Sequence, residues 1–198
     1  MRAIPAASAM IALALAGCSS LRQTQPPRSA MEQLLISAAA DRAVDQLKLD
    51  LPPRTKVLVD SQYFEGLDAK YTIGAIRDRL LKQGADLVAD RNSADVVIEI
   101  RSGGQSIDKR TTLWGIPGFN IPIPLSSGSL PFPELALYKK EQEIGVSKVA
   151  MTGYDRKGGE FKTASGPDYG FSRRTHYIIL LFFSWTNNDA VPGTEDNK

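Results

Sequence analysis

Apolar residues recur in the first half of the chain at the spacing of two amphipathic helices. The first stripe begins after Ser29 and Glu32, a pair with the spacing of a capping box, and ends before Pro52-Pro53. Its members, spaced largely at i, i+3, i+4 and i+7, are Met31, Leu34, Leu35, Ala38, Ala40, Ala43, Val44 and Leu47. A second stripe covers residues 70–83 and is followed by Gly84, a typical C-terminal cap. We therefore expect two helices, each with one face in the core.

Shorter apolar runs and alternating patterns predict strands after the first helix. The predicted strands are residues 56–60, 85–89, 95–101, 134–143, 145–155, 160–164 and 174–185. The last of these is apolar on both faces, which favours a central or covered position. Residues 156–159 form a tight turn. The pattern indicates a single α+β domain with a mixed or antiparallel sheet and two principal helices.

Residues 111–133 fit neither period. Their prolines exclude a helix and disfavour a central strand, yet the segment is rich in large apolar side chains. Two interpretations stay open: a cover laid over an apolar face of the sheet, or an exposed surface for a protein partner, an oligomer neighbour or lipid. The candidate surface residues are Trp114, Ile116, Phe119, Ile121, Ile123 and Phe132.

The first residues carry an export signal. Arg2 precedes an apolar run over residues 6–16 that is too short to span a bilayer. We expect residues 1–17 to be a signal peptide and residues 18–28 a polar tether. The α+β domain then covers residues 29–186. Residues 187–198 are polar and are expected to be a disordered tail.

The end of this signal, Leu15-Ala16-Gly17-Cys18, resembles the lipobox of bacterial lipoproteins. The resemblance implies cleavage between Gly17 and Cys18, a diacylglyceryl group on the thiol and an acyl chain such as palmitate on the new amino group. An ordinary secretory signal with an incidental cysteine is the alternative. Ser19 stands where enterobacterial lipoproteins of the inner membrane carry aspartate. By that resemblance the protein is held at the outer membrane, on its periplasmic side.

Composition narrows the chemistry. The formal net charge is only +2, which provides no large field for nucleic acid, so we expect no nucleic-acid partner. Cys18 is the sole cysteine and His176 the sole histidine. With that thiol expected to be acylated, internal disulfides, thiolate metal sites and cysteine nucleophiles are excluded. No cofactor motif is present, and we predict neither a metal nor a cofactor.

Two residues remain as candidates for catalysis. Ser106 and Lys109 fit the Ser-x-x-Lys pattern of penicillin-binding proteins and β-lactamases, but the Ser-Asp-Asn motif is missing. His176 has no Gly-x-Ser-x-Gly motif to supply a serine. We therefore predict no catalytic residue. A periplasmic hydrolase that uses Ser106 or His176 is the alternative.

Three stretches resemble a known domain. Residues 84–91 match a Gly-x-x-Leu-Val-x-x-Arg pattern, residues 94–98 an Ala-Asp-hydrophobic strand start, and residues 154–160 an Asp-x-x-x-Gly-Glu hairpin. These resemble the domain of the curli-secretion lipoprotein CsgG, of TolB amino-terminal domains and of penicillin-binding-protein activator lipoproteins. The similarity covers a little over half of the mature chain and carries no catalytic residue. The whole mature sequence is similar to an uncharacterised group of bacterial lipoproteins.

Because no complete catalytic constellation is present, we expect a non-enzymatic accessory or assembly lipoprotein with a protein partner in the cell envelope, or one that assembles as a homo-oligomer. A subunit of a CsgG-like secretion channel is a further alternative. Against it, we expect residues 111–133 to stand in place of the long alternating hairpins of the channel-forming member.

Overall fold

The protein is a long sheet with two helices on one side. The computed structural model describes residues 27–123 and 128–191. In chain order the helices and strands are α2 (Ala30–Val44), β1 (Lys56–Asp60), α3 (Ala69–Lys82), β2 (Asp86–Leu87), the short 3₁₀ helix η1 (Arg91–Ser93), β3 (Val96–Ile116), β4 (Phe119–Pro122), β5 (Ser129–Phe132), β6 (Leu135–Asp155), β7 (Phe161–Ile179) and β8 (Phe183–Asn188). The main sheet has the order β2-β1-β3-β6-β7-β8, with β1 parallel to its two neighbours and the other pairs antiparallel. The predicted α+β class and mixed sheet are confirmed.

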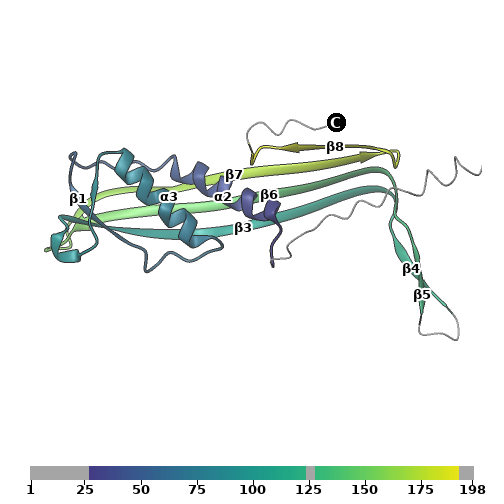
Figure 1. Ribbon diagram of the computed structural model, residues 1–198, viewed down its shortest axis with the longest axis horizontal. Coiled ribbons are helices and arrows are strands. Elements are labelled where there is room, and N and C mark those ends of the chain that lie inside the picture. Colours follow the sequence, from purple (N-terminus) through teal and green to yellow (C-terminus); the bar gives the residue numbers. More distant parts are fainter. Residues whose placement is uncertain (1–26, 124–127, 192–198) are drawn as a thin grey trace, which may run out of the picture.

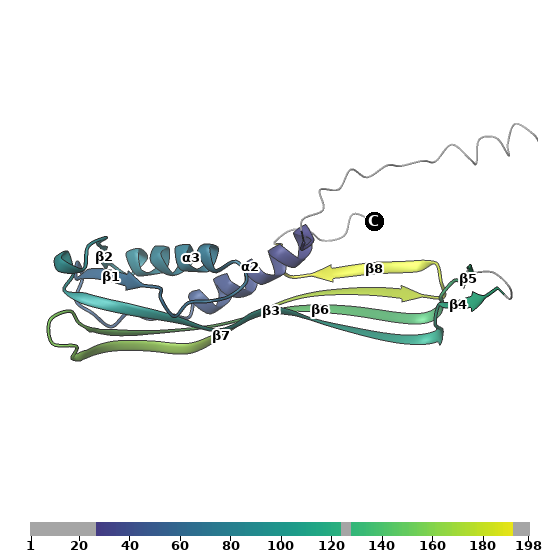
Figure 2. The same ribbon diagram turned by 90° about the horizontal axis from the view of Figure 1, so that it is seen from below.

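Three strands run the length of the molecule. β3 and β6 contain 21 residues each and β7 contains 19, so at about 3.3 Å per residue β3 and β6 span roughly 70 Å. Both helices lie on one side of this ribbon and over one half of it (Figures 1 and 2). We call that half the helical end. The half that carries β8 and the β4–β5 hairpin is the distal end.

These strands are much longer than the pattern predicted. The expected strand at residues 95–101 continues to Ile116, and those at 134–143 and 145–155 join into one, β6. Gly145 does not interrupt β6, because it is the point where α2 lies closest: a Cβ there would be 2.5 Å from the carbonyl oxygen of Leu35. β3 and β6 thus form one long hairpin that the pattern did not predict.

Helix α2 rests on β6 and β7 through small residues. At Gly170 of β7 a Cβ would lie 1.9 Å from the carbonyl oxygen of Ala39, and the Ser172 hydroxyl donates to the carbonyl of Leu35. Ala39 and Ala43 on the helix are fully buried. The absence of side-chain bulk on both surfaces allows the helix backbone to approach the sheet directly.

This contact also sets the buried face of α2. The capping box of Ser29 and Glu32 is present as predicted. The predicted buried stripe of α2, however, is wrong by about one residue at the start of the helix: Ile36 is buried, whereas Leu34 is 43% exposed. The alanines turn toward the sheet and rotate Leu34 outward. Beyond α2, the core lies between α3 and the helical end of the sheet and includes Leu47, Val57, Ile76, Leu80, Ile98, Ile100, Val149 and Met151.

The segment at 111–133 does not cover the sheet. β3 extends through its first residues, and the β4–β5 hairpin then continues beyond the end of the main sheet (Figures 1 and 2). The interpretation as a cover is therefore wrong. Pro122 and Pro131 are tolerated because β4 and β5 form a sheet of only two strands, in which a missing N–H need not break a central ladder.

The apolar run at 174–185 is a hairpin and not a central strand. β7 ends at Ile179, residues Leu180–Phe182 turn, and β8 returns along the edge. The tail prediction is wrong for residues 187–191: Asn187 and Asn188 belong to β8, and Asp189 forms an ion pair with Arg42. Residues 192–198 lie outside the described part. Within the described ranges, no helix is both long and apolar enough to cross a membrane.

The close approach of α2 predicts an asymmetric response to alanine at two glycines. Gly170→Ala should lower the free energy of unfolding by about 3 kcal/mol, because the new methyl group meets the backbone of α2. Gly74→Ala on α3 is the matched control. Nothing lies within 4 Å of a Cβ there, so replacing a helical glycine should raise stability by about 0.5–1 kcal/mol. Urea unfolding of both variants measures the difference, and equal stabilities would contradict the proposed packing.

Candidate binding surface

The distal end carries a dense group of exposed apolar side chains. They come from the end of β3, the β4–β5 hairpin, the start of β6 and the β7–β8 turn. We call this group the apolar tip; it consists of Trp114, Ile116, Phe119, Ile121, Ile123, Leu130, Leu135, Leu137, Leu180, Leu181, Phe182 and Phe183. Trp114 is 71% exposed and Phe182 is 85% exposed. A cluster of this kind, far from the core, usually marks an interaction site.

Backbone hydrogen bonds join these elements into one surface. Leu180 donates to the carbonyl of Leu137 at 2.9 Å, and Leu181 donates to that of Ala136 at 3.1 Å. The β7–β8 turn is therefore fastened to the start of β6, beside the point where β3 and β6 lead into the β4–β5 hairpin.

Aromatic pairs lie within the tip and just behind it. The rings of Phe119 and Phe132 stack with centroids 4.8 Å apart. Trp114 meets Tyr138 edge to face at 6.3 Å. These contacts hold the rings in fixed positions, while Trp114 stays mostly exposed and Phe119 about half exposed.

The β7–β8 turn has an unusual sequence for its conformation. Leu180 and Leu181 have φ angles of 48° and 69°, in the left-handed region where Gly or Asn is normally found. A bulky side chain there costs roughly 1–2 kcal/mol per residue. The two exposed leucines therefore lower local stability and add apolar surface. Backbone strain of this kind is associated with functional sites.

Charged residues begin beside the tip, where Glu134 directly precedes Leu135, and they are paired with one another. Lys139 binds Glu141 at 2.8 Å and Glu134 at 2.9 Å. These contacts raise the pKa of Lys139, while Lys139 lowers the pKa of Glu141. Lys140, on the other face of β6, lies 5.9 Å above the ring of Tyr177.

A second ion-pair group joins α2 to the middle of the sheet. Lys109 contacts Glu32 at 2.5 Å and Glu143 at 3.3 Å, and Arg174 also contacts Glu143. The hydrogen bond from the Lys109 ammonium lowers the pKa of Glu32, and the hydrogen bond from the backbone N–H of Ser29 lowers it further by a smaller amount. Glu32 and Glu143 in turn raise the pKa of Lys109. The group fixes the first turn of α2 at the level of Lys109 on β3.

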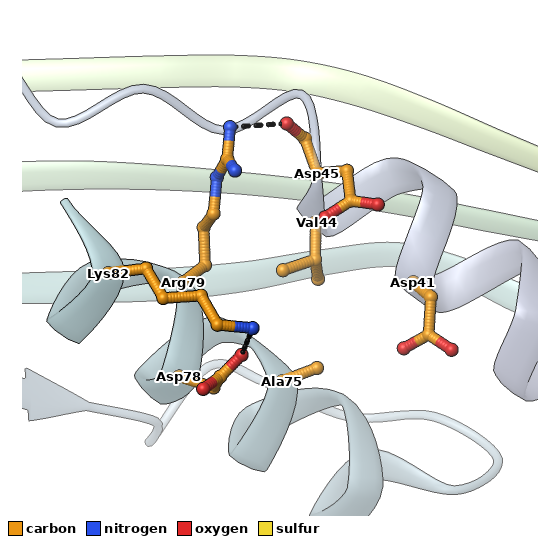
Figure 3. A pocket seen from close by; sticks show the side chains of 7 residues that line it. All are labelled: Asp41, Val44, Asp45, Ala75, Asp78, Arg79 and Lys82. Atoms are coloured by element: carbon orange, nitrogen blue, oxygen red, sulfur yellow. Dashed lines mark hydrogen bonds and ion pairs between the residues drawn. The ribbon is translucent and has the colours of Figure 1, made fainter.

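A hollow of about 220 Å³ lies between α2 and α3 (Figure 3). Its polar groups serve the fold. The guanidinium of Arg79 donates to the carbonyls of Asp45 and Leu47 at the end of α2. Lys82 forms an ion pair with Asp78 at 2.6 Å, which raises its pKa. Asp41 accepts a hydrogen bond from the hydroxyl of Tyr71 and raises the pKa of that phenol. The described residues of the hollow thus form a helix cap and an ion pair, with no nucleophile beside a base.

The structure does not bring the candidate catalytic residues together. Ser106 and Lys109 are three positions apart on a strand, so their side chains point to opposite faces, whereas the Ser-x-x-Lys chemistry needs them on one helix face. Lys109 faces α2. His176 lies on the same side of the sheet as Lys109. Across the ladders Ser106 is level with Phe171 of β7, and His176 is five residues farther along that strand. The Nδ1 of His176 contacts the hydroxyl of Thr186 at 2.8 Å.

No metal site is formed within residues 27–123 and 128–191, where no group of three or more ligating side chains gathers. The acidic residues near residue 90 act locally: Asp95 accepts from the backbone N–H of Lys56 and Asp86 contacts Arg54. Gly17 and Cys18, the predicted cleavage and lipidation positions, lie outside the described residues.

Of the candidate surface residues, Trp114, Ile116, Phe119, Ile121 and Ile123 are exposed and Phe132 is half-buried. Sequence reasoning missed the second half of the tip, Leu180–Phe183, because the turn contains no Gly, Asn or Pro. One signal was available: residues 111–133 and 177–188 contain no Asp, Glu, Lys or Arg. Two uncharged segments in a chain this rich in charge share one location in the fold.

The chain belongs to a family of unknown function (DUF6655), whose model matches residues 12–174. A search of curated proteins finds no significant match. The membership agrees with the expectation of an uncharacterised family, and any function has to be argued from the geometry.

The exposure of Trp114 predicts that its removal leaves the fold intact. Trp114→Ala should lower the free energy of unfolding by at most about 1 kcal/mol, the value of its edge contact with Tyr138. Ile98→Ala, at a fully buried position, is the comparison and should cost about 2–5 kcal/mol. Thermal or urea unfolding separates the two cases. If Trp114→Ala lowered the free energy of unfolding as much as Ile98→Ala, the result would contradict the exposed position of Trp114.

Proposed function

We propose that this protein is a lipid-anchored envelope protein that acts by binding and not by catalysis, with the apolar tip as its working surface. The observation that carries the proposal is the set of exposed apolar side chains at one end of a ribbon of roughly 70 Å. A folded chain that has already buried a complete core gains nothing for stability from a second, exposed cluster. Such a cluster is retained for contact with another surface.

The position of the protein follows from its N-terminus. The lipobox-like residues Leu15–Cys18 fall within the segment that the family model matches. Acylation of Cys18 would supply about 0.8 kcal/mol per buried CH₂ group, so two or three chains provide a durable anchor. We place the protein on the periplasmic side of the outer membrane. There the tip would meet another component of the envelope: a protein partner, a second copy of the chain or lipid.

The geometry offers little support for the alternatives. A hydrolase that uses Ser106 as its nucleophile would need a base such as His176 beside it. The side chains of Ser106 and His176 lie on different faces of the sheet. A channel subunit would need one continuous apolar face along its long hairpin. In the middle of the β3–β6 hairpin both faces carry charge: Lys109 and Glu143 on the helix side, and Asp108 and Arg110 on the other.

The anchor is tested by replacing its attachment point. Cys18→Ser should release the protein from the membrane fraction while circular dichroism and the unfolding transition stay unchanged, because all described elements lie beyond residue 26. Mass spectrometry of the mature N-terminus provides the direct measurement. An unmodified Cys18, or cleavage at another position, would contradict the lipoprotein assignment.

The working surface is tested in intact cells. A photo-crosslinking amino acid at Phe182 should capture a component of the envelope, since this ring is the most exposed in the tip. The same group at Phe161 is the control, because that ring is 65% exposed but lies at the helical end of β7. Capture from both positions, or from neither, would count against a specific role for the tip.

A further inference from the structure

From the order of side chains along the distal end, we infer that the apolar tip inserts into a lipid surface to the depth of the membrane interface. The inference deepens the proposed function by naming what the tip contacts. It depends on the arrangement of three successive layers of residues, whose levels are set by the strand register.

The outermost layer is mainly apolar, and the described residues of the hairpin and the turn include no ionisable group. It consists of the β4–β5 hairpin and the β7–β8 turn, and it lies in segments 111–133 and 177–188, which lack acidic and basic residues altogether. The charged residue next to this layer is Glu134, between β5 and β6, which is paired with Lys139 at 2.9 Å. Protein interfaces are usually surrounded by a polar, charged rim. An acyl-chain layer offers no ionic partner, and the exposed polar side chains among the described hairpin residues are the neutral Asn120 and Ser129.

The next layer back is aromatic. Trp114 pairs with Tyr138 across the β3–β6 ladder, and Tyr177 pairs with Trp185 across the β7–β8 ladder. The rings of Tyr177 and Trp185 stack with centroids 5.0 Å apart. Lys140, whose Nζ lies above the ring of Tyr177, occupies the same level. Trp and Tyr at the boundary with a snorkelling Lys are characteristic of the headgroup region of a bilayer.

The third layer limits the depth of insertion. At the level of Arg110 and behind it, both faces of the sheet are charged, with Asp108 and Arg173 on one face and Lys109 and Glu143 on the other. Each such charge opposes entry into the hydrocarbon. Arg110 is four residues from Trp114, about 13 Å along the strand. The tip therefore inserts, and the rest of the ribbon stays in water.

The backbone of the hairpin suits the same environment. An N–H group without a partner is costly in lipid, and Pro117, Pro122 and Pro131 have none. The β4–β5 pairing satisfies backbone groups between the two strands. Both strands of the β4–β5 sheet are edge strands, and the prolines reduce the number of unpaired backbone N–H groups on their outer sides.

The proposed anchor can reach the same bilayer. Residues 19–28 separate Cys18 from the cap of α2 and extend to at most about 36 Å. The first turn of α2 is fixed at the level of Lys109 by its ion pair with Glu32. From Lys109 to Trp114 is five residues, about 17 Å. Acyl chains and tip can therefore enter one membrane, and the ribbon is then held at two points.

The chain carries its own probe for this contact. Trp114 and Trp185 are its only two tryptophans, and both lie at the distal end. The chain from residue 18 onward, carrying Cys18→Ser, retains all the described elements and has no acyl chain. It is mixed with vesicles of phosphatidylglycerol and phosphatidylcholine, the latter brominated on its acyl chains.

Insertion should shift the tryptophan emission to the blue and quench it, because bromine on acyl carbons close to the headgroups quenches indoles held at the membrane interface. Phe182→Asp should lower the partition coefficient at least about tenfold, since it places a charge at the most exposed point of the tip. Phe161→Asp, the matched change at the opposite end, should leave the coefficient unchanged. Raising the salt concentration should have little effect, because the side chains proposed to insert are uncharged and the neighbouring Glu134 is paired with Lys139.

Three results would overturn the inference: no quenching with the unsubstituted tip, equal loss of partition in both variants, or binding that disappears in high salt. A blue shift without vesicles, together with dimers in sedimentation, would assign the tip to a second copy of the chain. If vesicles give no signal but the crosslinker at Phe182 captures a protein in cells, the lipid inference fails and the proposed function stands. If both experiments are negative, both fail.

Discussion

The continuous hydrogen-bonded ladder between β3 and β6 is the constraint on which the molecule depends. It begins in the core, where Val96 pairs with Asp155, and ends at the tip, where Ile116 pairs with Leu135. No described helix covers the distal end (Figure 2), so the position of its strands is fixed by this ladder and by the β6–β7 ladder beside it. Two shifts of register interrupt β3–β6 pairing, at Ser102/Gly104 and at Trp114/Gly115. The second lies where the strands leave the main sheet for the β4–β5 hairpin, and bulges of this kind bend and re-aim a strand.

Two different kinds of packing hold the ladder in place. At the helical end, large apolar side chains of β3 and β6 bury against α3 and β1, while small residues at Gly145 and Gly170 admit the backbone of α2. Farther along, the ion pairs of Glu32 and Lys109 replace apolar contact. Polar side chains on both faces keep the middle of the ribbon soluble without a cover. The hydrophobic surface of the protein is thus divided into a buried group at one end and an exposed group at the other.

The sequence predicted local features well and long-range ones poorly. Ser29 and Glu32 identified the start of α2, and residues 56–60 matched β1, because capping and a buried apolar run are local signals. The length of β3 was not predictable from alternation, since its middle is polar on both faces and is held by pairing with β6 and not by burial. Leu180 and Leu181 concealed a turn, because their left-handed conformation is set by the strands on either side and not by their own preference.

The candidate site shows the same division. Its aromatic residues in the Pro-rich segment were identified from composition, but their arrangement depends on which segments the ladders bring to one end. Leu180 is placed beside Leu137 only because β6 and β7 stay in register over most of their length. An exposed cluster of this size invites aggregation in a protein that diffuses freely. In the arrangement we propose, confinement to a membrane would remove that cost, because lipid would cover the tip wherever the anchor on Cys18 held the chain. The proposed anchor and the proposed insertion of the tip would then act together, since the anchor keeps the exposed apolar cluster next to the lipid.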